Sequence, residues 1–213
     1  MIALSTAFKR ALIGISIDDQ KETFEIDANC KHSENILLSI DGLLNKMNKN
    51  FSQNNSFGVV IGPGSFTGIR ICTALVKGFL GGGAKANVVT LTSFELMAYT
   101  YINKYKPKEN FVCAIDALSG LCFVCEFDKD GKKISAEKMI TIEEFQKETK
   151  CTVGLAEETL NCKIKITPTA EQLLELCCQK ESIGKLSKEE DILPVYLRKS
   201  QAEASYEERL KKS

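Results

Sequence analysis

The sequence has one histidine, no tryptophan and no excess of charge of either sign. It contains 28 basic and 28 acidic side chains in 213 residues, so its formal net charge is zero. Proteins that bind nucleic acid through their own broad positive field carry a basic excess, and the balance here argues against that class. The solitary His32 excludes any metal site that needs two imidazoles, such as the His-pair zinc motifs.

Long apolar runs are missing as well. No stretch approaches the roughly 18 consecutive apolar residues that a membrane-spanning helix needs, so we expect no membrane association. Lys9 and Arg10 interrupt the apolar start of the chain, and we therefore expect no secretory segment. Nine cysteines cannot all be paired with one another. We expect reduced thiols in a cytoplasmic protein.

The remaining composition is that of a folded globular protein, with 44% apolar and 26% charged residues. Two short apolar runs at residues 1–8 and 11–17 are joined only by Lys9-Arg10, which predicts an antiparallel hairpin. A third strand is predicted at residues 23–26. The chain therefore opens with three short strands.

A helical pattern follows the three strands. Apolar residues recur with a 3.6-residue period over residues 36–47, and Ser33 is a suitable N-cap. A buried strand is predicted at residues 57–61, before a glycine-rich turn at residues 62–68. A second helix begins within that turn and is predicted to end near residue 80, because three glycines follow.

The first half closes with a strand and a helix. A strand is predicted at residues 87–91, and Thr92 with Glu95 forms a capping box for a helix. Residues 104–110 are polar and contain Pro107, which predicts a boundary between two lobes there. The predicted lobes comprise residues 1–105 and 106–213.

The second half repeats this order of elements. Thr141 and Glu144 make another capping box, and Pro168 is predicted at the first position of a later helix. Residues 191–213 are predicted to begin extended and to end as a charged helix or a frayed tail. The strands of this half are predicted at residues 111–117, 121–128, 134–140, 152–155 and 163–166. The repeated order predicts an α/β fold of two related lobes.

The glycine-rich turn is the most informative stretch of the sequence, and it reads Gly62, Pro63, Gly64, Ser65, Phe66, Thr67 and Gly68. A strand, a glycine turn and a helix N-terminus can hold an anion through backbone N–H groups. Alternatively, the glycines allow the helix to lie close to the sheet. It is not a P-loop, because no Lys-Ser/Thr pair follows the last glycine. Arg70 is poorly placed for the helix dipole, so we expect a carboxylate of the chain or of a partner to hold it.

The other candidate sites are weaker. Cys122 and Cys125 form a C-x-x-C pair, and Cys177 and Cys178 are adjacent, but residues 123–124 are predicted as strand, whereas zinc knuckles have a turn there. We therefore favour buried free thiols. His32 has no partner for a Ser–His–Asp arrangement and is explained by a helix cap.

One carboxylate and one basic run complete the set of candidates. Asp116 ends a predicted strand and is either a candidate site carboxylate or a turn-forming residue. Lys104, Lys106 and Lys108 lack the interleaved aromatic residues that stack on bases, and we interpret them as a solvated linker.

The glycine-rich turn together with Arg70 and the following Ile71-Cys72-Thr73-Ala74 resembles the signature of the TsaB family, also called YeaZ. Three further segments fit in order: His32-Ser33-Glu34-Asn35, Asp116, and Pro194-Val195-Tyr196-Leu197-Arg198. The resemblance implies an actin-like fold of two ribonuclease-H-like lobes. It also implies a non-catalytic subunit of the bacterial complex for tRNA threonylcarbamoyladenosine synthesis.

The resemblance further implies the partners. These are the paralogous catalytic subunit TsaD, which transfers a threonylcarbamoyl group to N6 of adenosine 37 in tRNAs that read ANN codons, and the ATPase TsaE. The chain alone is expected to form a homodimer, to bind no cofactor and to meet tRNA only through the complex. A site for ATP or ADP at the interface of the complex stays open.

The sequence departs from the family pattern at two places. The family often begins with Asp-Thr, but this chain has Ser5-Thr6, and Ser5 cannot supply the negative charge that Mg²⁺ would need. Where the family has Asp-Ala-Arg, the chain has Asp116-Ala117-Leu118. The second departure puts any charged contact at that position in doubt. Ser5 and the single histidine argue against the alternatives, which are an independent actin-like ATPase or a glycoprotease-like hydrolase. A tRNA-binding module is the third hypothesis.

The family pairs through its first two helices, packed against those of a partner. Two adjacent apolar helix faces can bury an interface of standard size. The predicted lining residues are Ile36, Ile40, Leu43, Leu44, Met47, Leu75, Phe79 and Leu80. Some of these must instead face the chain's own sheet.

Overall fold

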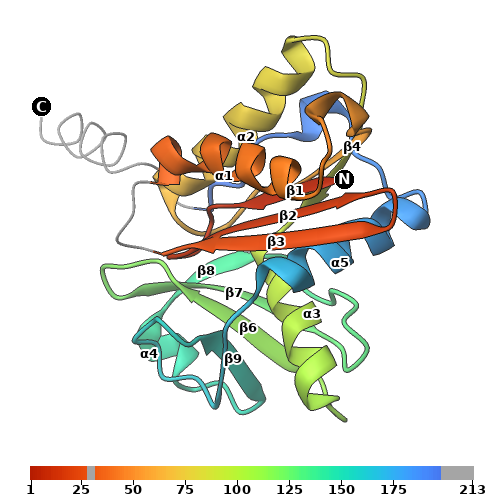
Figure 1. Ribbon diagram of the computed structural model, residues 1–213. Helices are drawn as coiled ribbons and strands as arrows, with labels where there is room; N and C mark the ends of the chain where they lie inside the picture. Colours follow the sequence, from red (N-terminus) through yellow and green to blue (C-terminus); the bar gives the residue numbers. More distant parts are fainter. Residues whose placement is uncertain (28–31, 198–213) are drawn as a thin grey trace, which may run out of the picture.

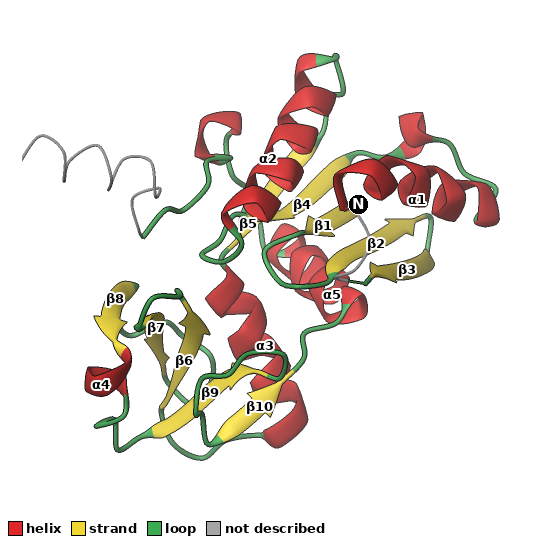
Figure 2. Ribbon diagram, turned by 90° about the vertical axis from the view of Figure 1, so that its left-hand side faces the viewer, coloured by secondary structure: helices red, strands yellow, loops and turns green. Residues whose placement is uncertain are grey.

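The computed structural model describes residues 1–27 and 32–197, and within them the chain forms two mixed five-stranded sheets (Figures 1 and 2). The strand orders are β3-β2-β1-β4-β5 and β10-β9-β6-β7-β8. In each sheet, the first three strands in chain order pair antiparallel. The fourth strand pairs parallel with the first, and the fifth pairs parallel with the fourth. The predicted α/β fold of two related lobes is confirmed.

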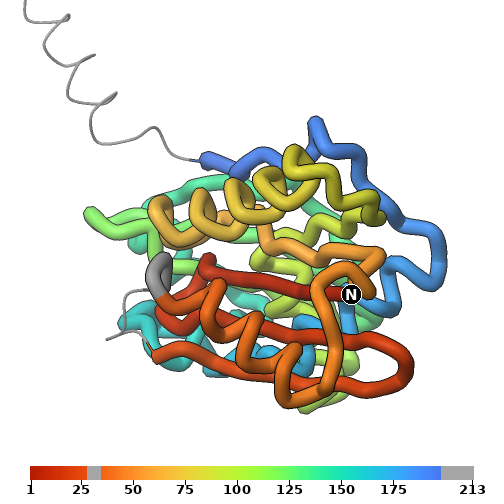
Figure 3. The backbone as a smooth tube through the Cα atoms, turned by 45° about the horizontal axis from the view of Figure 1, so that its top comes forward, coloured from red at the N-terminus to blue at the C-terminus, as the bar shows by residue number. Residues whose placement is uncertain are grey.

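The first sheet uses the strands predicted from the start of the chain. Its strands are β1 Ile2–Ser5, β2 Ala11–Ile17, β3 Gln20–Ile26, β4 Ser56–Val60 and β5 Asn87–Leu91. The β1–β2 hairpin is antiparallel, with Ile2 opposite Ile15. Two helices, α1 His32–Lys46 and α2 Phe66–Gly81, cover the same face of this sheet (Figures 1 and 3). A short 3₁₀ helix, Phe51–Gln53, follows α1.

The second sheet follows the same plan. Its strands are β6 Phe111–Asp116, β7 Leu121–Phe127, β8 Lys138–Thr141, β9 Cys151–Leu155 and β10 Ile164–Ile166. One turn of helix, α4 Ile142–Phe145, packs against β7 and β8. The strand predicted at residues 134–140 is shorter and later than expected, because the Glu126 N–H donates to the Ser135 hydroxyl at 2.9 Å and not to a backbone carbonyl, which interrupts the ladder before β8 begins.

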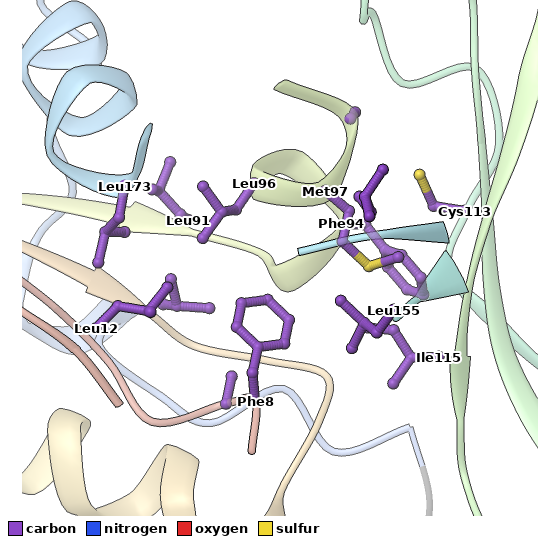
Figure 4. Close-up of a cluster of buried hydrophobic side chains, with 14 of the residues drawn as sticks. Phe8, Leu12, Leu91, Phe94, Leu96, Met97, Cys113, Ile115, Leu155 and Leu173 are labelled. Atoms are coloured by element: carbon purple, nitrogen blue, oxygen red, sulfur yellow. The ribbon is translucent and has the colours of Figure 1, made fainter. Parts of the chain in front are cut away.

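Two helices lie between the sheets and contact each other. Helix α3, Ser93–Tyr105, packs on β6, β9 and β10 of the second sheet, whereas α5, Ala170–Ser182, packs on β1, β2, β3 and β5 of the first. The sheets fall on either side of the proposed boundary at residues 105 and 106, but each intervening helix packs on the sheet of the other half. One apolar core therefore runs through both lobes (Figure 4).

The predicted capping chemistry is confirmed in full at α3 and in part at α4, where the Thr141 hydroxyl accepts the Glu144 N–H at 3.0 Å without the reciprocal bond of a capping box among the described contacts. Thr92 and Glu95 form the reciprocal capping box of α3, with hydrogen bonds of 3.2 and 2.7 Å. Pro168, however, is not the first helical residue. Thr169 is the N-cap of α5 and pairs reciprocally with Gln172, which places Pro168 outside the helix.

The last described segment returns to the first sheet. The backbone N–H of Ser187 donates to the Val88 carbonyl at 2.7 Å, and that of Val195 donates to the Ile61 carbonyl at 2.8 Å. Between them, residues 189–191 form a 3₁₀ turn and Ile192 is fully buried. The predicted charged helix or tail lies beyond residue 197, outside the described residues, and so do the side chain of Ser33 and its predicted cap. Across the described ranges, every helix is too short or too polar to span a membrane.

Candidate functional site

The glycine-rich turn packs directly against the segment that follows β1. The Ser65 N–H donates to the Ala7 carbonyl at 2.9 Å, and the Thr6 hydroxyl donates to the Gly68 carbonyl. A Cβ atom at Gly68 would lie 1.8 Å from the Thr6 carbonyl oxygen, so only glycine fits. Ser65 caps α2, since its hydroxyl accepts the Gly68 N–H at 3.2 Å. Of the two interpretations of the turn, these contacts support close packing of the helix start against the sheet and not an anion-binding site.

The Thr6 side chain also anchors α2 one turn further on. Its hydroxyl oxygen lies 3.0 Å from the Cys72 sulfur, in a fully buried contact. Burial raises the pKa of the Cys72 thiol to about 12, so the group stays neutral and acts as a small packing residue. The turn, the end of β1 and the first two turns of α2 thus form one rigid unit.

Apolar side chains fill the space between the lobes next to this turn. Phe8 of the β1–β2 connection lies between Leu12 of the first sheet and Leu155 of the second, in the buried cluster that Figure 4 shows. The Lys9 ammonium crosses to the second lobe and donates to the Glu157 carbonyl at 2.6 Å. The end of β1 and the residues after it thus place a buried phenyl ring next to the buried hydroxyl groups of Ser5 and Thr6.

Asp116 is occupied by its own turn. As the last residue of β6, it accepts the Leu118 N–H through Oδ1 at 2.7 Å, while its own N–H donates to Glu158 Oε2 at 2.9 Å. Leu118, Ser119 and Gly120 all have positive φ, of 61°, 55° and 77°. The turn-forming interpretation of Asp116 is the one that the geometry supports.

Burial raises the pKa of Glu158 to about 7, and the neighbouring Asp116 carboxylate adds to the shift. The folded state therefore binds this proton more tightly than the unfolded state, whose pKa is near 4.5. Stability that comes from this proton is present at low pH and is lost as the pH rises toward 7.

We expect Glu158→Gln to stabilise the chain above pH 7, by about 2 kcal/mol in the free energy of unfolding. Glutamine keeps a carbonyl oxygen for the Asp116 N–H but carries no charge to desolvate. Denaturant titrations between pH 4.5 and 8 measure the effect. The advantage of the variant should vanish near pH 4.5, and a constant difference across this range would contradict the assignment.

The C-x-x-C pair is not a metal site. Cys122 packs with Phe145 and Leu160 on one face of the second sheet, whereas Cys125 lies on the opposite face, in the core between the lobes. Side chains three apart on a strand point to opposite faces, which separates the two thiols. Burial raises the pKa of both to about 11. The eight described cysteines are all free, and no group of three or more metal-binding side chains occurs among the described residues.

The predicted interface residues divide into two sets. Four on α1 and one just after it are buried in the chain's own core against the first sheet, which corrects their assignment as interface lining: Ile36, Ile40, Leu43, Leu44 and Met47. Those on α2 are only partly buried, although Phe79 stacks on Phe57 with ring centroids 5.4 Å apart. Leu75 and Leu80 are the two that remain best placed to contact a partner.

The outer faces of α1 and α2 carry apolar and small residues that were not among the predicted interface residues. Leu37 and Leu38 are 47% and 69% exposed. Gly42 of α1 and Ala74 and Gly78 of α2 are also exposed. Nothing lies within 4 Å of the position that a Cβ would take at either glycine. We call these five residues the outer face; their exposure becomes visible only in the tertiary structure.

Arg70 lies at the edge of this outer face. Its guanidinium carbon stacks 3.9 Å from the centroid of the Phe66 ring, and its Nε donates to the Tyr196 hydroxyl at 2.6 Å. All three side chains are exposed. The expected carboxylate is not among its partners in the described part of the chain, where aromatic rings and a hydroxyl hold it.

Two sheets of the same topology, with the connecting helices packed between them, define the two-lobed α/β actin-like class. Residues 26–177 match the family model described as TsaD: tRNA N6-adenosine threonylcarbamoyltransferase. Together with the relatives below, this match shows that the chain belongs to that family, in its TsaB (YeaZ) branch.

The relatives agree along nearly the whole chain. The protein of Haemophilus influenzae named tRNA threonylcarbamoyladenosine biosynthesis protein TsaB is 25% identical over 93% of this chain and 93% of its own length. The Escherichia coli K12 protein of the same name is 28% identical over 81% of this chain and 83% of its own. The structure of YeaZ from Pseudomonas aeruginosa has a TM-score of 0.74 at 20% identity, covering 92% of this chain and 98% of that one, and shares the fold.

Proposed function

We propose that this chain is a non-catalytic subunit of tRNA threonylcarbamoyladenosine biosynthesis that binds and activates the catalytic subunit TsaD. The observation that carries the proposal is the outer face of α1 and α2, an apolar helical surface that the described residues leave exposed. The names of the curated relatives place TsaB proteins in this biosynthesis, and the matching family model is that of TsaD. We propose a cytoplasmic location for the complex.

The non-catalytic role is supported by the residues at the positions where an actin-like enzyme would act. The chain has a single histidine and carries Ser5 in place of the family's aspartate. Phe8 fills the space between the lobes, and Asp116 caps its own turn. These features disfavour the alternative of an independent actin-like ATPase or a glycoprotease-like hydrolase.

The glycines of the outer face support close packing by another helix. A glycine inside a helix costs about 0.5–1 kcal/mol relative to alanine. Neither Gly42 nor Gly78 is required by contacts within the chain, since both positions have free space around them. A partner backbone that approaches closely would explain both residues, as small residues do at tightly packed helix pairs.

The same face would serve two partners. A two-fold homodimer uses one patch on both copies, so a homodimer through the outer face would compete with TsaD. A stable interface buries about 1,600 Å² in total, which two helix faces can supply. We propose that the homodimer forms in isolation, that TsaD displaces one copy, and that TsaE and tRNA join the resulting complex.

Reconstitution tests the proposal. The purified chain with TsaD and TsaE should support threonylcarbamoylation of a tRNA that reads ANN codons, and omission of the chain should remove most of that activity. The chain alone should neither modify tRNA nor hydrolyse ATP. Modification by the chain alone, or full activity of TsaD and TsaE without it, would overturn the proposal.

A further inference from the structure

We infer that Phe66, Arg70 and Tyr196 form a receptor for an acidic side chain of the protein partner, in which the Arg70 guanidinium binds the carboxylate. The inference rests on the proposed function, because it describes one contact within the proposed interface. TsaD should have an exposed aspartate or glutamate at the position that faces Arg70.

The three side chains hold the guanidinium in a defined orientation. Phe66 and Arg70 are one helical turn apart on α2, and the guanidinium carbon is 3.9 Å from the Phe66 ring centroid and 5.3 Å from that of Tyr196. The two rings are themselves in contact, with centroids 4.9 Å apart. Tyr196 is positioned by the Val195 hydrogen bond to the Ile61 carbonyl. Little side-chain entropy remains to be lost on binding.

The hydrogen bond to Tyr196 leaves the outer edge of the guanidinium available. Nε donates to the tyrosine hydroxyl, so the two terminal nitrogens are the donors that remain, and they find no acceptor among the described residues. Two parallel N–H donors match the two oxygens of a carboxylate. The geometry thus points to a bidentate arginine–carboxylate pair.

The position of Arg70 on α2 argues against a purely structural role. Arg70 is the fifth residue of α2, one turn from the positive N-terminal end of the helix dipole, and the dipole gives a cation no stabilisation at that end. An incoming anion would be attracted both by the guanidinium and by that end of the helix. The arginine is therefore better suited to receive a ligand than to stabilise α2.

The surroundings favour a protein over a nucleic acid. Binding of a polyanion needs several cations, but the only other basic side chain of α2 is Lys77, about two turns away. Phe66, Arg70, Ala74 and Gly78 form one row at a spacing of four residues, which joins the cluster to the outer face. Arginine and aromatic residues beside an apolar surface are the typical composition of a protein–protein hot spot.

Binding of TsaD to full-length variants tests the inference, with calorimetry at several salt concentrations. Arg70→Gln should weaken binding by at least about tenfold at low salt without changing the melting temperature. Arg70→Lys should restore only part of the affinity, because an ammonium cannot bind both carboxylate oxygens in the same way. Lys108→Gln, which removes an exposed charge on the connection between α3 and β6, away from α2, should bind TsaD as the unchanged chain does.

Leu38→Glu separates this inference from the proposed function. If Leu38→Glu prevents binding while Arg70→Gln binds normally, the carboxylate receptor is wrong and the proposed interface stands. If neither variant affects binding, the proposed interface itself is wrong. Loss of tRNA binding by Arg70→Gln, with unchanged affinity for TsaD, would also overturn the inference in favour of a nucleic-acid contact.

Discussion

Leu38→Glu should abolish the association with TsaD and leave the isolated chain folded. Leu38 is 69% exposed on α1, so a carboxylate there stays hydrated in the free chain. In the complex it would be buried without a partner, at a cost of several kcal/mol. Size-exclusion chromatography and calorimetry with TsaD measure the loss, and circular dichroism checks the fold.

Two further substitutions control this experiment. Leu118 is 68% exposed on the β6–β7 turn, so Leu118→Glu matches the exposure and the charge change away from the outer face and should bind TsaD normally. Leu43 is buried in the core beneath α1, so Leu43→Glu should unfold the chain instead. Normal binding by Leu38→Glu, or a folded Leu43→Glu variant that fails only in pairing, would contradict the assignment of these two helix faces.

Gly68→Ala should destabilise the chain by about 3 kcal/mol or more in the free energy of unfolding. The added methyl group would lie 1.8 Å from the Thr6 carbonyl oxygen, and both atoms belong to backbone-anchored positions that cannot rotate away. The strain would separate α2 from the end of β1 and break the hydrogen bond from Thr6 to Gly68. Urea denaturation measures the change.

Gly78→Ala on the same helix is the matched control. No atom lies within 4 Å of the new methyl group, so the substitution should stabilise the isolated chain by about 0.5–1 kcal/mol through helix propensity. It should weaken pairing, because the methyl group projects into the outer face. Equal effects of Gly68→Ala and Gly78→Ala on stability would contradict the tight packing at the glycine-rich turn.

Local signals predicted the secondary structure well, because they depend on neighbours along the chain. The reciprocal pair Thr92 and Glu95 predicted the start of α3, and the short link at Lys9-Arg10 predicted the β1–β2 hairpin. The displaced start of α5 was a competition between two local signals. Proline is favoured at the first helical position, but the reciprocal pair of Thr169 and Gln172 satisfies two backbone groups and set the first helical residue at Ala170, two residues later.

The interface residues could not be sorted by the same means. The 3.6-residue period of residues 36–47 identifies one apolar stripe, and that stripe packs on the chain's own sheet. Leu37 and Leu38 lie beside it in sequence, but only the position of α1 over β2 and β3 shows that they face away from the sheet. The same limit applied to Arg70, whose partner Tyr196 is 126 positions away along the chain.

Sequence information alone was sufficient to predict the class of fold, the family resemblance and the free thiols, and to exclude a metal site with two histidines. Composition, short-range periodicity and one compact motif determine these four properties. Which helix packs on which sheet, which leucines face outward, and why Gly68 tolerates no side chain were decided by contacts between residues far apart in the chain. Such contacts depend on how several helices and strands pack together around one core, and a local sequence pattern does not determine that packing.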